Sequence, residues 1–141
     1  MADFLRAAAD PEIAQRAERV IASKSHELCS AVDSYATKLE TALAAGDMPA
    51  LFDEAHEIRG LAETAGLVAA GRIANGLCCY LDEAKRRGIA ADKSLLTFYV
   101  EAIARATRAT DDATRLGDTV AIELAALASR RLSEAKEKVK K

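Results

Sequence analysis

The sequence predicts an all-α fold, an antiparallel up-and-down four-helix bundle with an additional N-terminal helical segment and a C-terminal helical extension. Half of its 141 residues are hydrophobic, which is enough to bury a core in a chain of single-domain size. Aromatic residues contribute only 4%, tryptophan is absent, and there are two prolines, whereas alanine and leucine recur throughout. This composition favours packed helices over sheets, and we expect one domain spanning residues 1–141.

A first helix is predicted over residues 11–22. Asp10 followed by Pro11 is typical of a helix start, with the aspartate as N-cap and the proline in the first turn. The polar residues 23–26 predict a break or bend, after which the apolar period resumes for several turns. The bundle core is therefore expected to span about residues 25–116, with the first helix outside it.

Two helices follow in the predicted core. One begins at Asp47 and ends near Gly66, and the next runs from about residue 69 to residue 87. Basic residues in the last turn of the second helix complement its dipole. Because the connections between these helices are short, neighbouring helices are expected to be antiparallel.

The remaining sequence predicts a further bundle helix and a C-terminal one. The bundle helix restarts after Asp92 and continues toward Leu116. Gly117 and Asp118 interrupt the pattern, and Asp118 is expected to cap a last helix over about 118–138. The alternative is one long helix that continues through the glycine.

Charge and apolar patterning exclude several classes of partner. The net charge of −2 with 30% charged residues predicts a surface of mixed sign, whereas nucleic acid requires a basic stripe. No apolar run approaches the roughly 18 residues that span a bilayer, and the N-terminus lacks the pattern of a signal peptide. Cys29, Cys78 and Cys79 form neither metal-ligand spacing nor a disulfide framework. We expect a cytoplasmic protein that binds neither nucleic acid nor membrane.

One histidine, His56, lies off the apolar stripe of its predicted helix. At about 100° per residue, it points roughly 140° away from that stripe, so we expect the imidazole to face outward. The stripe itself consists of Leu51, Ala55, Ile58, Ala62 and Ala65. Four residues share the histidine's side of the helix: Phe52, Arg59, Gly60 and Glu63.

Gly60 and Arg59 indicate how a partner could use an outward-facing imidazole at His56. Gly60 lies one turn after His56 inside the helix, where glycine costs about 1 kcal/mol relative to alanine. A partner that brings a bulky reactive group onto the imidazole would need the space that the missing side chain leaves. Arg59 is close enough in the helix to offer its guanidinium to an anion held on His56.

The run His56-Glu57-Ile58-Arg59-Gly60, followed by Ala62 and Gly66, resembles the signature of histidine-containing phosphotransfer (HPt) domains. That signature is His-x-(Leu/Ile)-(Lys/Arg)-Gly followed by small residues and a glycine. The motif covers roughly residues 48–87, and its downstream part is similar to the family's next helix through Ile73, Leu77, Cys78, Leu81 and Asp82. Arg59 stands where lysine is commoner and Leu61 where serine is frequent; arginine keeps the charge.

The resemblance implies a phosphorelay intermediate. His56 would accept a phosphoryl group from a receiver-domain aspartate, on Nε2, and pass it to another receiver; imidazole is a suitable nucleophile near neutral pH. Arg59 would stabilise the phosphate and Gly60 would give steric access. Phe52 fits either a docking contact or the bundle margin, and Glu63 fits either a binding residue or a solvated one.

The implied partners are response-regulator receiver domains and the receiver domains of hybrid histidine kinases. Magnesium is expected on the receiver, so the chain itself would need no cofactor or metal and would act as a monomer.

Several alternatives remain beside this interpretation. His56 could be an ordinary surface histidine, and a non-catalytic helical adaptor that binds signalling proteins would tolerate its loss. A histidine kinase would require a nucleotide loop and an ATP-binding domain, neither of which the sequence contains, so autokinase activity is not expected. Asp53 and His56 have the spacing of a di-iron helix, but that design needs a second such pair.

Overall fold

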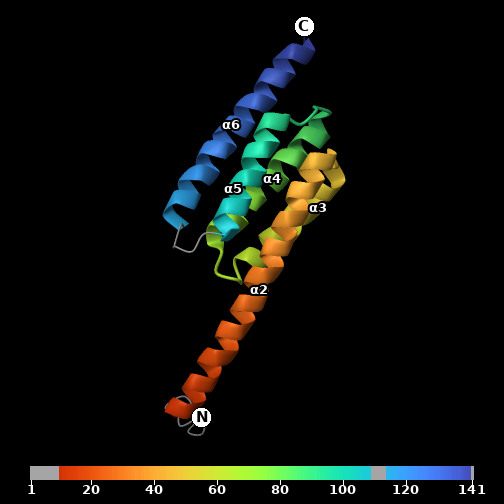
Figure 1. Cartoon of the computed structure of the whole chain (residues 1–141). Helices are drawn as coiled ribbons and strands as arrows, with labels where there is room; N and C mark the ends of the chain where they lie inside the picture. The colour runs from red at the N-terminus through yellow and green to blue at the C-terminus, as the bar shows by residue number, and fades with distance from the viewer. Residues whose placement is uncertain (1–9, 109–113, 141) are drawn as a thin grey trace.

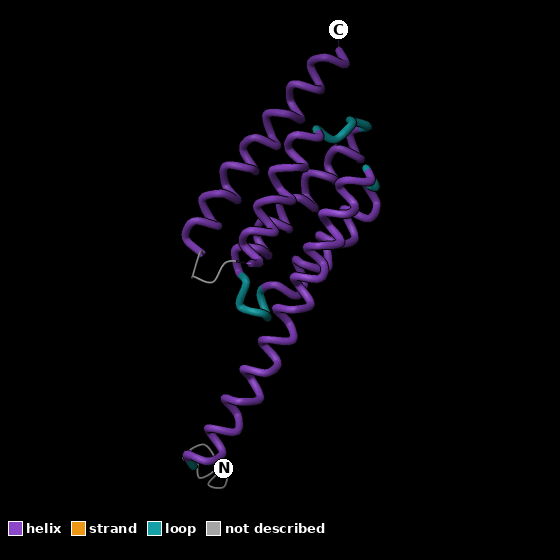
Figure 2. Tube along the Cα trace, in the orientation of Figure 1, coloured by secondary structure: helices purple, strands orange, loops and turns teal. Residues whose placement is uncertain are grey.

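The computed structural model describes residues 10–108 and 114–140, with side chains described for 10–108 and 119–135. No strand occurs in these ranges, which confirms the predicted all-α fold (Figure 2). The described part of the chain forms helices α2 Pro11–Ala45, α3 Met48–Ala62, α4 Val68–Arg87, α5 Lys93–Arg108 and α6 Thr114–Lys140 (Figure 1). Within it, no helix combines the length and hydrophobicity that a membrane span requires.

Helices α2 to α5 form the antiparallel bundle that the sequence predicts. Each packs against two neighbours, because α3 lies between α2 and α4, and α5 closes the ring by contacting both α4 and α2 (Figure 1). Short turns at Gly46 and Gly88, both in the left-handed backbone region, reverse the chain between successive helices. Large side chains with almost no exposed surface fill the centre, among them Leu39, Leu51, Ile58, Ile73, Leu77, Leu95, Leu96, Tyr99 and Ile103.

The predicted break in the first helix is wrong. Helix α2 runs without interruption from Pro11 to Ala45, so no separate helix ends at residue 22. Residues 23–26 contain neither glycine nor proline, and their polar side chains are easily solvated where the helix has no neighbour. The start is as predicted, since the Asp10 side chain accepts a hydrogen bond of 2.9 Å from the backbone N–H of Glu12. Figure 1 shows the N-terminal half of α2 projecting beyond the bundle.

The last two helices also differ from the prediction. Helix α5 ends at Arg108, short of the expected Leu116, and α6 begins at Thr114, so Gly117 and Asp118 lie inside a helix and Asp118 is not its cap. Residues 109–113 lie outside the described residues. The C-terminal helix packs along α4 and α5 and buries Leu124, Ala128 and Leu132. This burial offsets the cost of about 1 kcal/mol for a helical glycine.

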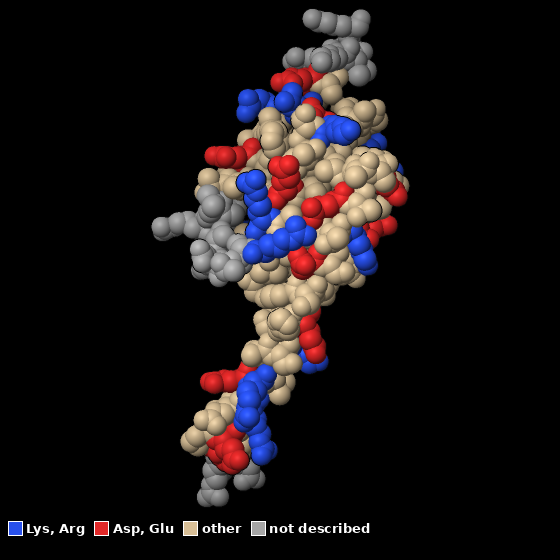
Figure 3. Space-filling model, in the orientation of Figure 1, with Lys and Arg blue, Asp and Glu red and all other residues tan. Residues whose placement is uncertain are grey.

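Charged groups of both signs are interspersed on the face of the molecule that Figure 3 presents. One group of them links two helices: the Arg108 guanidinium on α5 lies 2.8 Å from carboxylate oxygens of both Asp33 and Glu40 on α2. Because these side chains are exposed, each pair contributes little to stability.

Two helical glycines differ in their surroundings. A Cβ built on Gly71 of α4 would lie 3.3 Å from the Cβ of Ala62 on α3, so the glycine allows a close approach of the two helices. A Cβ built on Gly60 would meet no heavy atom within 4 Å. Local packing therefore accounts for Gly71 but not for Gly60.

We predict that Gly60→Ala raises the free energy of unfolding by up to about 1 kcal/mol, because alanine is the better helix former at an open position. Gly71→Ala should gain less or destabilise, since the same propensity gain is opposed by the contact with Ala62. Urea unfolding followed by circular dichroism measures both. Equal gains in the two variants would contradict the close approach of α3 and α4.

A second prediction concerns alkaline pH. Cys78 is 3% exposed, and burial raises the pKa of its thiol from 9.0 to about 11 although the nearby Arg59 guanidinium lowers it. Above pH 9.0 the unfolded chain loses a proton that the folded chain keeps, so the thiol's contribution to stability falls until about pH 11. Cys78→Ala should flatten this part of the pH profile in urea unfolding measurements. Cys79→Ala, at the exposed neighbouring position, should keep most of the wild-type slope, because Cys79 is the smallest of the causes that shift the pKa of Cys78. An unchanged slope in Cys78→Ala would refute the assignment.

Candidate functional site

His56 lies near the middle of α3 and is exposed, as its position opposite the apolar stripe predicts. The rotation of the helix is fixed from the other side, where Leu51, Ala55, Ile58 and Ala62 have no exposed surface. Its start is fixed by Asp47, whose side chain accepts a 3.1 Å hydrogen bond from the backbone N–H of Ala50. Because α3 is anchored along its length, the imidazole has a defined position on an open surface.

Arg59 lies one turn after His56, and its guanidinium contacts the imidazole itself, whereas the sequence predicts a contact with an anion held on His56. Its Nη2 atom lies 3.1 Å from Nδ1 of His56, and its Nη1 atom donates a hydrogen bond of 3.3 Å to Oδ1 of Asn75 on α4. The guanidinium therefore bridges the histidine and the neighbouring helix.

Asn75 was not identified from the sequence. The available signal was Gly71, one turn earlier on α4, because a glycine inside a helix can mark a close helix–helix approach that brings the following turn within reach of the partner helix. Sequence spacing within α3 could not indicate a residue that α4 contributes.

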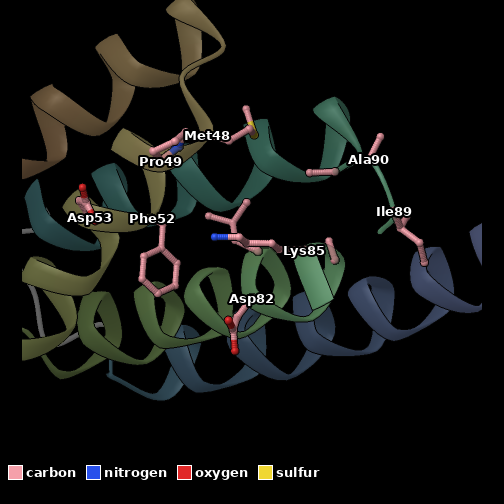
Figure 4. A pocket seen from close by; sticks show the side chains of 11 residues that line it. Met48, Pro49, Phe52, Asp53, Asp82, Lys85, Ile89 and Ala90 are labelled. Carbon is pink, nitrogen blue, oxygen red and sulfur yellow. The ribbon is translucent and has the colours of Figure 1, made fainter. Parts of the chain in front are cut away.

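Phe52 is half-buried one turn before His56, and the two rings are nearly parallel, with planes 9° apart and centroids separated by 6.1 Å. Phe52 also lines a hollow of about 510 Å³ between α3, the C-terminal half of α4 and the segment that follows α4. Figure 4 shows its ring directed from α3 toward α4. The lining is mostly apolar and consists of Met48, Pro49, Phe52, Asp53, Leu81, Asp82, Ala84, Lys85, Ile89, Ala90 and Ala91.

The structure places Gly60 and Glu63 on the histidine's side of α3, as predicted. Both are exposed, and the space over Gly60 is open. Glu63 directly follows the helix as its C-cap and, together with Arg59 and Asn75, lines a smaller hollow of about 270 Å³. Their functional roles remain predictions, whereas their grouping around one exposed surface is a structural fact.

The chemistry available here is that of a single exposed nucleophile beside a fixed cation. Across residues 10–108 and 119–135, no three histidine, cysteine or carboxylate side chains come together as metal ligands. Among these described residues, Asp53 and His56 have no second pair beside them of the kind that a di-iron centre uses. The arrangement suits transfer of an anionic group to and from the imidazole.

One known protein family matches this chain. The family model described as Hpt domain matches residues 25–130, which include His56, Arg59 and all of α3, α4 and α5. No curated protein matches the chain, and no solved structure matches it. Domains of the matched family are helical phosphocarrier modules of two-component signalling that interact with receiver domains, and they are not kinases. Because the match covers most of the sequence, the chain belongs to the Hpt domain family.

Proposed function

We propose that this protein is a phosphorelay intermediate in which His56 accepts a phosphoryl group from the aspartate of one receiver domain and passes it to another. The observation that carries the proposal is the exposed imidazole of His56 with the Arg59 guanidinium 3.1 Å from it and open space over Gly60. A histidine so placed is accessible to a second protein and stands beside a group that can stabilise anionic oxygens.

In the transfer step a ring nitrogen of His56 forms a bond to phosphorus while the bond between phosphorus and the aspartyl oxygen breaks, which regenerates the receiver's carboxylate. The transition state is loose, with negative charge spread over the equatorial oxygens, so catalysis depends on position and on cations. Arg59 supplies one cation. The receiver supplies magnesium, and this chain needs neither ATP nor a cofactor of its own.

The hollow beside Phe52 provides a surface on which a receiver domain can dock. Phe52 contacts the histidine ring on one side and lines the hollow on the other, so a partner seated there would have its reactive group close to His56. Met48 adds exposed apolar surface, and Asp53, Asp82 and Lys85 contribute polar groups to the lining. This pattern of an apolar centre with charged groups is typical of protein–protein interfaces. In this proposal the relay acts as a monomer in the cytoplasm.

A helical adaptor is the second candidate, because the same hollow could bind a signalling protein without any chemistry at His56. Such an adaptor would keep its partners when the imidazole is removed, and its partners would carry no phosphate to it. Phosphate labelling of the chain by phosphorylated receiver domains therefore distinguishes the phosphorelay intermediate from the adaptor.

We predict that His56→Gln abolishes phosphoryl acceptance while the helical signal and thermal midpoint stay nearly unchanged, because an exposed polar replacement disturbs no core contact. The measurement is incubation with a panel of phosphorylated receiver domains, followed by detection of acid-labile phosphate on this chain. His26→Gln is the matched control, since His26 is also exposed on a helix. Normal labelling of His56→Gln would overturn the site, and an unlabelled wild-type chain would favour the adaptor.

A further prediction tests the steric role of Gly60. Gly60→Leu should slow transfer from a receiver at least tenfold, because a branched side chain would occupy the approach to the imidazole. A tenfold slowing corresponds to an increase of about 1.4 kcal/mol in the activation free energy. Glu101→Leu is the control, since it adds an exposed leucine on α5, which does not contact α3. Transfer at the wild-type rate in Gly60→Leu would rule out the access role.

A further inference from the structure

We infer that Asn75 is a positioning residue that holds Arg59 on Nδ1 of His56, and that this arrangement fixes the ring's tautomer and slows loss of the phosphoryl group. The part concerning the phosphoryl group rests on the proposed function, whereas the part concerning the tautomer does not. The Arg59 guanidinium forms a bridge between α4 and α3, because it contacts Asn75 and His56 at the same time.

The bridge is a consequence of how α4 packs on α3. Gly71 permits close contact with Ala62, and Asn75 follows Gly71 by one helical turn, just as Arg59 precedes Ala62 by nearly one turn. The close approach therefore brings the Asn75 amide oxygen to 3.3 Å from Nη1 of Arg59. A planar guanidinium held at one nitrogen has little freedom to turn, so its Nη2 atom stays near the imidazole.

The tautomer follows from the donor and acceptor inventory. A guanidinium has only donors, so in the 3.1 Å contact Nδ1 of His56 must be the acceptor and carries no proton. A neutral imidazole carries its single proton on one of its two nitrogens, which places it on Nε2. Nε2 is also the ring nitrogen farther from the backbone.

This tautomer has a different consequence before and after transfer. Before transfer, Nε2–H has no lone pair to offer to phosphorus. Attack through Nε2 therefore requires Arg59 to leave Nδ1, so that Nδ1 takes up a proton while Nε2 gives up its own. The anionic oxygens of an incoming phosphoryl group attract the guanidinium and favour this departure. The two roles of Arg59, on the ring and on the phosphoryl group, therefore alternate.

After transfer to Nε2, the phosphoryl oxygens still attract the guanidinium, but the hydrogen bond to Asn75 favours its return to Nδ1. On Nδ1 the guanidinium protects the phosphorus–nitrogen bond. In hydrolysis the water oxygen bonds to phosphorus, the electron pair of the broken bond returns to Nε2, and the water proton passes to solvent. The ring leaves as neutral imidazole only if Nδ1 has first gained a proton. Arg59 occupies the lone pair that would accept this proton, and Asn75 keeps it there.

The test compares Asn75→Leu, which removes the amide oxygen, with Asn75→Asp, which keeps an acceptor for Arg59. Nitrogen-15 NMR of the unphosphorylated chain reports which ring nitrogen of His56 bears the proton, and circular dichroism checks folding. The wild type and Asn75→Asp should show an unprotonated Nδ1. In Asn75→Leu the two nitrogen shifts should move toward the values of a ring that exchanges between tautomers.

The same three proteins are then phosphorylated with phosphoramidate, so that no receiver is needed, and the loss of acid-labile phosphate is followed. Asn75→Leu should lose phosphate about fivefold faster, the effect of one hydrogen bond of ordinary strength, and Asn75→Asp should restore the slow rate. Unchanged nitrogen shifts in Asn75→Leu would overturn the positioning role, and unchanged phosphate loss would overturn the protective one. A chain that shows the tautomer shift but receives no phosphate from any receiver would contradict the proposed function alone.

Discussion

The site depends on the burial of one face of α3. Leu51, Ala55, Ile58 and Ala62 are completely enclosed by the bundle, and any rotation of the helix would expose several of them to water. Burying a leucine or isoleucine side chain, such as Leu51 or Ile58, stabilises the fold by roughly 1.5–3 kcal/mol, so the cost of rotation far exceeds thermal energy. The direction of the imidazole is therefore set by residues that never touch it.

The second determinant is the distance between α3 and α4. Small residues at the contact, Gly71 on one helix and Ala62 on the other, let the helices approach closely enough for Arg59 and Asn75 to meet. The site is therefore formed by α3 and α4 together, and the surroundings of His56 depend on how closely these two helices pack. A larger residue at either position would alter the chemistry without touching a functional group.

The sequence was sufficient for those features that depend on periodicity and local spacing. The buried stripe of α3, the outward direction of His56 and the nearness of Arg59 to it all follow from 3.6 residues per turn. Features that depend on tertiary packing were wrong or absent: α2 continues through residues 23–26, α6 starts before Gly117, and Asn75 was overlooked. Exposed polar residues and single glycines do not end a helix by themselves, and the partner of a side chain on another helix has no fixed spacing in sequence.

The two halves of the uninterrupted α2 helix differ in how strongly the rest of the fold holds them. Its C-terminal half is clamped by α3 and α5, whereas residues 10–24 are all exposed, including Ile13, Val20 and Ile21. Hydrogen bonds in the projecting half are held mainly by helix propensity, so residues 10–24 can unwind while the bundle stays folded. We therefore expect amide hydrogen exchange to slow along this one helix, from the first turns after Pro11 to the buried turns near Leu39.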